Sequence, residues 1–316
     1  MATAAPPAGP SETTAPSLGE AFDRCQAYTK ARASNFYYAF LSLPKPKRSA
    51  IYATYAFAGT VDDIVDAAGA GDEQRRALAE ATSLLEAAYA SETRDWLGLA
   101  LSDAVIRYAI PKPYFLDLIA GMEQDVRQDR YETFAELEDY CYRAASVIGL
   151  ICIEIFGYDR GQRDTAIAAA IDLGKALQLT NIMRDLVEDA ERGRVYLAQE
   201  DLRRFGYSEA ELRAGMQTDA FRALMTEYAA RAHAFYASGQ RLIPLLDGPR
   251  SRMCCNGLQG VYRGLLREIE QRDYDVYSER VRFSKSALLA QMLRLWLAGA
   301  LHSRRLRLRP RRRAAE

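Results

Sequence analysis

The sequence predicts an all-α fold, a single-domain helical bundle with a central cavity. Apolar residues recur at helical spacing from about residue 19 to residue 300. No segment shows the sustained period-two alternation with β-branched residues that marks a strand. The breaks between periodic segments are short, as is usual between neighbouring helices of one compact bundle.

Proline and glycine clusters mark where the helices end. Taken in order along the chain, they divide it into roughly eight to ten helices, with breaks at Pro44-Lys45-Pro46, Gly69-Ala70-Gly71, Pro111-Lys112-Pro113, Gly157-Tyr158-Asp159, Gly193, Gly206 and the segment from Pro244 to Pro249. None of these breaks is a long linker rich in proline, glycine and serine. We therefore expect one domain over residues 19–300, preceded by a disordered leader at 1–18 and followed by a basic disordered tail at 301–316.

The composition is that of a globular protein, with 316 residues of which 49% are hydrophobic and 27% charged. The formal charge is zero, but residues 302–316 hold seven arginines and one glutamate, so the tail carries about +6 and the rest about −6. We expect no nucleic-acid partner. The tail is either solvated or makes a peripheral contact with anionic lipid.

The numbers and spacing of the cysteines and histidines, and the lengths of the apolar runs, indicate the cellular compartment. No apolar run reaches the ~20 residues needed to cross a bilayer, and the N-terminus lacks the layout of a signal peptide. The five cysteines are odd in number and show no metal-ligand spacing, which is typical of reduced thiols in the cytosol. Because the chain has only two histidines, a zinc site is not expected. These residues are Cys25, Cys141, Cys152, Cys254, Cys255, His233 and His302. We expect a cytoplasmic protein.

Two pairs of aspartates, each spaced by four residues, carry most of the functional information. Asp62 and Asp66 form one pair, and Asp185 and Asp189 form the other. With 3.6 residues per turn, each pair projects from one face of a helix. Like charges at this spacing destabilise a helix by a few tenths of a kcal/mol, so a chain that has two such pairs gains something else from them. A divalent metal held by oxygen ligands is the expected gain.

The second pair is extended by amides. Asn181, Asp185 and Asp189 lie at i, i+4 and i+8 of one expected helix, and Gln178 is close to the same stripe. A carboxamide beside carboxylates is a set of hard oxygen ligands that suits Mg²⁺, with Mn²⁺ as the alternative. Because Mg²⁺ is often completed by substrate phosphates, the expected ligand is a phosphorylated or diphosphorylated molecule.

Cations and aromatic side chains fit such a ligand. Neither of the glycine-rich phosphate loops occurs, so phosphate binding is expected to run through metal and side chains. Arginines and lysine near the second pair and near residue 280 can contact phosphate oxygens; they are Arg184, Arg192, Arg194, Arg280, Arg282 and Lys285. Aromatic residues such as Phe36 and Tyr52 are core packing first, but they can also line a hydrocarbon pocket or stabilise a carbocation.

Other interpretations of the same residues remain open at this stage. A single acidic pair on a helix is usually a solvated face, and isolated arginines are usually surface charges. A metal-dependent phosphohydrolase also clusters aspartates, but it normally needs histidine ligands or a nucleophilic aspartate motif, and the chain has only two histidines. Two acidic pairs, one of them with Asn181 on its face, favour the metal site.

Three segments in the same order resemble the signatures of the squalene/phytoene synthase family. They are Asn35-Phe36-Tyr37 through Ile51 to Phe57 and on to Asp62-Asp63-Ile64-Val65-Asp66, then Tyr140 to Gly149, and then Gln178 to Asp189 followed by Ala190 to Leu197. The similarity extends over about residues 20–295. The resemblance implies an isoprenoid synthase fold, Mg²⁺ dependence, and the joining of two prenyl diphosphates at their C1 ends.

The resemblance also assigns roles to residues. Asp62 and Asp66 match its first metal-binding pair, and Asn181, Asp185 and Asp189 match the second. Positions that contact substrate or its diphosphate are matched by Gln178, Arg184, Tyr262 and Arg280. The chain departs from the pattern at Ala58-Gly59, where the family commonly has cysteine and arginine, and at Asn35, where a serine is frequent. The arginine that assists a diphosphate is therefore missing, unless another arginine compensates.

Several products are compatible with the resemblance. We favour two farnesyl diphosphates condensing to presqualene diphosphate, with NADPH needed only if the reaction continues to squalene. The first alternative is a phytoene synthase that uses two geranylgeranyl diphosphates, and dehydrosqualene is a further product. A non-catalytic relative that serves as an assembly or binding factor is the remote alternative, because such a protein is expected to lose the metal-binding aspartates.

Overall fold

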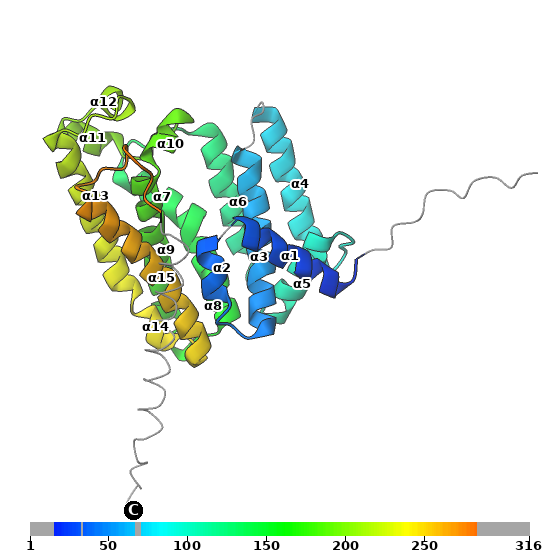
Figure 1. The fold of residues 1–316 in the computed structure, drawn as a ribbon. Coiled ribbons are helices and arrows are strands. Elements are labelled where there is room, and N and C mark those ends of the chain that lie inside the picture. Colours follow the sequence, from blue (N-terminus) through cyan, green and yellow to red (C-terminus); the bar gives the residue numbers. More distant parts are fainter. Residues whose placement is uncertain (1–15, 33, 67–70, 283–316) are drawn as a thin grey trace, which may run out of the picture.

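A computed structural model describes residues 16–32, 34–66 and 71–282, and these residues form helices and no strand (Figure 1). The all-α prediction is confirmed. In chain order the elements are α1 (Leu18–Arg32), α2 (Ser34–Phe40), α3 (Lys45–Asp66), α4 (Gly71–Ala90), α5 (Trp96–Arg107), α6 (Lys112–Arg127), α7 (Phe134–Cys141), the π-helix η1 (Tyr142–Ser146), α8 (Val147–Phe156), the 3₁₀ helix η2 (Arg160–Gln162), α9 (Arg163–Arg184), α10 (Leu186–Glu191), α11 (Gln199–Phe205), α12 (Glu209–Arg213), α13 (Asp219–Gly239), α14 (Leu242–Leu245) and α15 (Gly248–Gln271).

The prediction of eight to ten helices is wrong, because the described residues alone contain fifteen α-helices. The excess comes from short helices such as α10, α11, α12 and α14, which have four to seven residues. Such segments span two turns or less, so they leave too few apolar positions for a helical period to be seen. Local capping defines some of them. Ser208 and Glu211, for example, form a capping box at the start of α12.

Two groups of helices pack around the centre of the bundle (Figure 1). In the first group, α3 packs against α1, α4, α5 and α6. In the second group, α9 packs against α8, α13 and α15, and α2 lies against α15. Large side chains from both groups, such as Tyr52, Phe57, Phe115 and Tyr236, are buried in the core. This arrangement leaves α3 and α9 facing the same central space.

Close backbone contact fixes α9 against the segment that precedes α8. A Cβ atom at Gly174 would lie 2.3 Å from Ser146 Cα, so only glycine allows α9 to approach η1 this closely. The Ser146 hydroxyl donates a hydrogen bond to the carbonyl oxygen of Ile171 at 2.7 Å. A π-turn inserted in a helix often marks a functional site, and η1 lines the cavity described below.

The expected domain limits are only partly covered by the described residues. Helix α1 begins at Leu18, close to the expected end of the leader. Residues 1–15 and the basic tail at 301–316 lie outside the described part of the chain, so the leader and the tail stay predictions. Within the described part, no helix combines the length and apolar character needed to span a membrane.

Candidate active site

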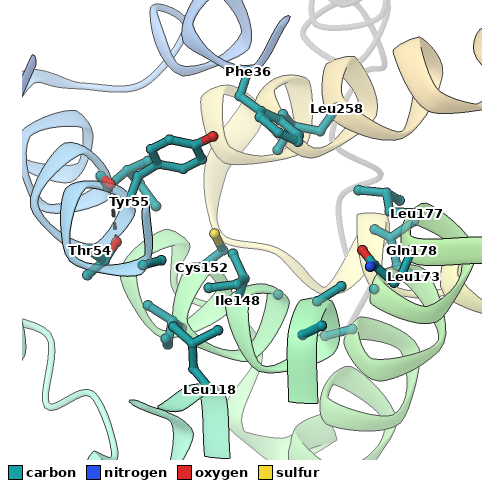
Figure 2. A pocket seen from close by; sticks show the side chains of 18 of the residues that line it. Phe36, Thr54, Tyr55, Leu118, Ile148, Cys152, Leu173, Leu177, Gln178 and Leu258 are labelled. Carbon is teal, nitrogen blue, oxygen red and sulfur yellow. Dashed lines mark hydrogen bonds between the residues drawn. The ribbon is translucent and has the colours of Figure 1, made fainter. Parts of the chain in front are cut away.

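A cavity of about 310 Å³ opens between the two groups of helices. Its walls are mostly apolar, and Figure 2 shows Phe36, Leu118, Ile148 and Leu258 directed into it from four different helices. Polar side chains gather at one end, where Arg32, Asp62, Gln178, Asn181 and Tyr262 also line the space. The cavity therefore combines a polar mouth with an apolar interior, as expected for a ligand with a charged head and a hydrocarbon body.

The cavity is deep along the helix axes. Lining positions on α3 run from Asp62 to Ile51, and those on α9 run from Asn181 to Ala170, eleven residue-to-residue steps in each case. At 1.5 Å per residue these stretches are about 16 Å long. The two C-terminal ends lie at the same end of the cavity, because the Arg194 guanidinium, just after α10, donates to the Val65 carbonyl oxygen at 3.5 Å.

The opposite end of the cavity is closed by apolar residues from three elements. Phe156 at the end of α8, Leu242 of α14 and Cys255 of α15 all line it there. The Lys47 ammonium, near the start of α3, donates to the Phe156 carbonyl oxygen at 2.5 Å, which places Phe156 far from Asp62. A hydrocarbon chain that enters from the polar mouth would therefore end against Phe156 and its neighbours.

The first acidic set lies at the end of α3. The Asp62 carboxylate is about half exposed and pairs with the Arg32 guanidinium at 2.5 Å. Arg32 also pairs with Asp63, and the Tyr28 hydroxyl donates to Asp63 Oδ2 at 2.6 Å. Asp66 is the last residue of α3, but its side chain lies outside the described part, so its role stays a prediction.

The second acidic set differs from the prediction of one continuous helix face. Helix α9 ends at Arg184, and Asp185 has non-helical angles of φ −101° and ψ 13° before α10 begins at Leu186. Hydrogen bonds from the Asp185 amide to the Asn181 carbonyl (2.8 Å) and from the Asp189 amide to the Asp185 carbonyl (2.9 Å) continue across this break. The helical spacing is thus retained although the helix is interrupted at Asp185.

Two arginines converge on Asp185. Arg184 donates to both carboxylate oxygens, at 2.7 and 2.5 Å, and Arg280 approaches Oδ1 with Nε at 3.0 Å. Arg280 also pairs with Glu188 at 3.0 Å. Hydrogen bonding to Asp185 helps keep the pKa of Arg184 above its usual value although burial opposes this. Arg184 and Arg280 thus bring two guanidinium groups to the mouth of the cavity, where they pair with Asp185 and Glu188, and guanidinium groups are suited to bind an anion there.

Asn181 offers an oxygen without a partner. Its Oδ1 atom is buried and accepts no hydrogen bond from the residues that the structure describes, while its amide nitrogen donates to Gln178 Oε1 at 3.4 Å. An unsatisfied buried acceptor costs about 1–3 kcal/mol, so this atom is suited to a ligand that enters the cavity. Beside it, burial raises the pKa of Tyr262, whose ring stacks on Phe36 with centroids 5.5 Å apart.

Two carboxyl groups behind the mouth have perturbed pKa values. Burial, followed by repulsion from Asp185, raises the pKa of Asp189 to about 7. Burial likewise raises the pKa of Asp125 on α6 to about 6, and this carboxylate accepts hydrogen bonds from Tyr140 (2.9 Å) and Tyr196 (3.1 Å). The sequence analysis did not identify Asp125. In the sequence it is one of three carboxylates of α6, with Asp117 and Glu123, and nothing in the spacing distinguishes it from them.

The structure brings most of the predicted site residues together; Tyr52 is an exception, and the side chain of Asp66 lies outside the described part. Phe36, Asp62, Gln178, Asn181 and Tyr262 line the cavity, and Arg184, Arg280, Asp185 and Asp189 lie in the second acidic set. Tyr52 does not line the cavity. Its ring stacks on Tyr37 at 5.7 Å and meets the edge of Phe40 at 6.3 Å, so it packs behind a residue that does. Of the remaining predicted cations, Lys285 lies outside the described residues.

The same order of features is found in known proteins. A sequence profile described as "Squalene/phytoene synthase" matches residues 29–287, which include both acidic sets. The chain belongs to the squalene/phytoene synthase family. It is a prenyltransferase, and the reaction of the family is the head-to-head condensation of two prenyl diphosphates, so the family resemblance and the expected enzyme class are confirmed.

Individual relatives and solved structures agree with this membership. The chain is 35% identical over 301 residues to a 15-cis-phytoene synthase of Synechocystis sp., with 92% of this chain and 89% of the relative covered. It is 37% identical over 283 residues to a 15-cis-phytoene synthase of Synechococcus elongatus, with 87% and 91% covered. A dehydrosqualene synthase crystal structure superposes with a TM-score of 0.82 at 28% identity, covering 90% of this chain and 98% of that one.

A further structural neighbour is the squalene synthase HpnC of Alicyclobacillus acidocaldarius, with a TM-score of 0.75 at 29% identity and coverage of 81% of this chain and 95% of that one. The solved structures therefore include a dehydrosqualene synthase and a squalene synthase, while the curated relatives cited above are phytoene synthases. The comparisons favour the phytoene synthase alternative over the presqualene diphosphate reading that the sequence analysis preferred.

Proposed function

We propose that this squalene/phytoene synthase family member condenses two geranylgeranyl diphosphates to phytoene through a cyclopropyl diphosphate. The observation that carries the proposal is the deep apolar cavity with both acidic sets at one end. Support for the C20 substrate comes from the phytoene synthases that match it over most of both chains. Presqualene diphosphate formation from two C15 units is the second candidate, supported by the C30 enzymes among the solved structures.

We propose that the residues at the mouth would hold Mg²⁺ together with the substrate, since the described residues, which leave out the Asp66 side chain, do not by themselves gather three His, Cys, Asp or Glu side chains into a metal site. Asp62, Asp185 and Asp189 would supply carboxylate oxygens, and Asn181 Oδ1, which has no hydrogen-bond partner among the described residues, would supply a neutral one. All of these are hard oxygen donors, the kind that Mg²⁺ prefers, with Mn²⁺ as an alternative. When bound, Mg²⁺ neutralises the diphosphate group and so eases its departure from an allylic carbon. Asp66 is proposed as a further ligand on the basis of the family resemblance alone.

The side chains of the chain perform the remaining tasks. Arg184 and Arg280 hold positive charge at the mouth, where the departing diphosphate collects negative charge. The apolar walls exclude water, which would otherwise quench an allylic cation. The rings of Phe36 and Tyr262 are stacked beside the cavity and present π-faces to that cation. Because burial raises the pKa of Tyr262, its hydroxyl stays protonated and is not a base at neutral pH.

Product identification tests the proposal. Purified protein is incubated with Mg²⁺ and either C15 or C20 diphosphate, with and without NADPH, and organic-soluble products are identified by mass. We expect a C40 hydrocarbon from the C20 substrate whether or not NADPH is present. A C30 product from the C15 substrate alone would support the second candidate, and the absence of any condensation product would overturn both.

The basic tail is proposed as a peripheral membrane contact, because the product is a water-insoluble hydrocarbon and each near-surface cation contributes about 1 kcal/mol toward an anionic bilayer. The test is truncation after Ala300 followed by sedimentation with vesicles that contain anionic lipid. We expect the truncated chain to bind fewer vesicles than the full chain. Equal binding would argue against a role of the tail.

A further inference from the structure

Arg32 occupies a distinctive place at the mouth of the cavity. Among the described residues that line the cavity, it is the only lysine or arginine. It is the last residue of α1, and its guanidinium pairs with Asp62 at 2.5 Å and also with Asp63. The cations described above, Arg184 and Arg280, are both engaged with the second acidic set. Arg32 is thus a cation that pairs with the first acidic set.

The neighbouring position on α3, Gly59, is crowded by the side chain of Tyr28, which would have to shift to admit a larger residue. A Cβ atom at Gly59 would lie 2.7 Å from the Tyr28 hydroxyl oxygen and 2.8 Å from Tyr28 Cε1, closer than real Cβ contacts. Tyr28 is held there by its 2.6 Å hydrogen bond to Asp63. Tyr28 and Arg32 are one turn apart on α1, so they share a face. The same face of α1 therefore closes position 59 and delivers a guanidinium to Asp62.

We propose that Arg32 is a diphosphate-binding residue that replaces, from α1, the arginine expected in place of Gly59 on α3. This inference rests on the proposed function, since it assumes that a prenyl diphosphate enters the mouth. A guanidinium matches phosphate oxygens with two parallel hydrogen bonds. With Arg32 at one acidic set and Arg184 and Arg280 at the other, the diphosphate meets arginines on both sides of the mouth.

The exposure of the ion pair supports a binding role over a structural one. The side chains of Arg32 and Asp62 are 30% and 52% exposed. Pairs this exposed contribute about 0–1 kcal/mol to stability, so Arg32 adds little to the fold. In the ligand-free chain the guanidinium neutralises the carboxylate. When Asp62 binds a cation instead, the guanidinium is released toward the diphosphate.

Binding of inorganic pyrophosphate in the presence of Mg²⁺, measured by calorimetry, tests the inference. The variants are Arg32→Gln, Arg32→Lys and, as a matched control, Lys30→Gln, which removes a charge from an exposed residue of the same helix. We expect Arg32→Gln to weaken binding about ten- to hundredfold, Arg32→Lys to weaken it less, and Lys30→Gln to leave it unchanged. Melting temperatures of all three should stay close to the wild-type value.

The inference is overturned if Arg32→Gln binds pyrophosphate as tightly as Lys30→Gln does. If Arg32→Gln fails to fold, Arg32→Lys provides the test, because lysine keeps the positive charge but cannot donate two parallel hydrogen bonds to a phosphate. Wild-type affinity for pyrophosphate in Arg32→Lys would then overturn the inference. Failure of the proposed function looks different. It would be a wild-type protein that forms no condensation product from either prenyl diphosphate, whatever its affinity for pyrophosphate.

Steady-state kinetics give a second, independent test of the role of Arg32. With a prenyl diphosphate as substrate, loss of a diphosphate contact raises KM and lowers kcat/KM in Arg32→Gln, whereas a purely structural defect lowers the amount of active enzyme and leaves KM unchanged. An unchanged KM in a folded, active Arg32→Gln variant would contradict the inference while leaving the proposed function intact.

Discussion

Replacing Gly174 by alanine is expected to separate α9 from η1. A Cβ atom at this position would meet the backbone of Ser146, at 2.3 Å from Cα and 2.7 Å from N. Backbone atoms on both sides of the contact cannot rotate away as a side chain could. The substitution therefore forces the helices apart at a point where Gly174 lines the cavity.

The magnitude follows from two opposed terms. Alanine is favoured over glycine in a helix interior by about 1 kcal/mol, whereas overpacking of a core costs about 1–3 kcal/mol, and more where the backbone must move. The new Cβ at position 174 would meet backbone atoms of Ser146, which cannot rotate away, and this places the cost at the upper end of that range. We expect a net loss of about 2 kcal/mol of unfolding free energy.

Urea denaturation and thermal melting measure the effect. The control is Gly19→Ala in the first turn of α1, where the nearest atom to a new Cβ is 3.9 Å away, so stability should change by less than about 0.5 kcal/mol. Gly174→Ala should also lower the rate of condensation because the cavity wall shifts. A Gly174→Ala protein as stable as wild type would refute the packing argument.

Three further substitutions test separate parts of the structure. Asp125→Asn removes a carboxyl whose folded-state pKa is about 6. In the wild type this carboxyl contributes stability near pH 4, and the contribution is lost as pH rises through 6. Urea titrations should therefore show the unfolding free energy of Asp125→Asn rising relative to wild type by up to about 3 kcal/mol between pH 4 and 7. Arg231→Met leaves the buried Asp201 carboxylate without its 2.6 Å partner and should cost about 3 kcal/mol in the same assay. Gly59→Ala should lower the melting temperature, and the loss should shrink in a Tyr28→Ala background, because the ring that the new Cβ meets is then absent.

Each of these predictions has an outcome that contradicts it. A stability difference between Asp125→Asn and wild type that is constant from pH 4 to 7 would show that burial does not raise the pKa of this carboxyl. As a control, Arg107→Met breaks an exposed ion pair with Asp103 and should cost less than about 0.5 kcal/mol of unfolding free energy. An equally small cost for Arg231→Met would contradict the expectation that the buried pair with Asp201 matters more for stability than an exposed pair. Equal effects of Gly59→Ala with and without Tyr28 would exclude the proposed contact.

The helical fold could be predicted from the sequence because long helices such as α3, α9 and α15 bury one side and repeat apolar residues at helical spacing. The short helices could not, because α12 and α14 have five and four residues. The break at Asp185 was also missed. The sequence around Asp185 has no glycine or proline that would mark an interruption. The backbone hydrogen bonds also keep the helical pattern across the break, so the helical spacing of the side chains is unchanged.

The candidate site was predictable where spacing along one helix places residues together, as for Asn181 and Gln178. It was not predictable where the contact joins distant segments. Arg32 lies 30 residues before Asp62, and the sequence alone does not show that the end of α1 meets the end of α3. Tyr52 was assigned to substrate because it is aromatic and near the first signature, but helical phase turns it toward Tyr37 instead.

The cooperation of the two acidic sets can be measured directly as the rate of diphosphate release from geranylgeranyl diphosphate in the presence of Mg²⁺. Asp62→Asn alters the first set and Asp185→Asn the second, while Asp72→Asn changes an exposed carboxylate that does not line the cavity. We expect each of the first two to lower the rate about a hundredfold or more and Asp72→Asn to leave it unchanged. A folded Asp62→Asn or Asp185→Asn protein that releases diphosphate at the wild-type rate would contradict the assignment of this cavity as the active site.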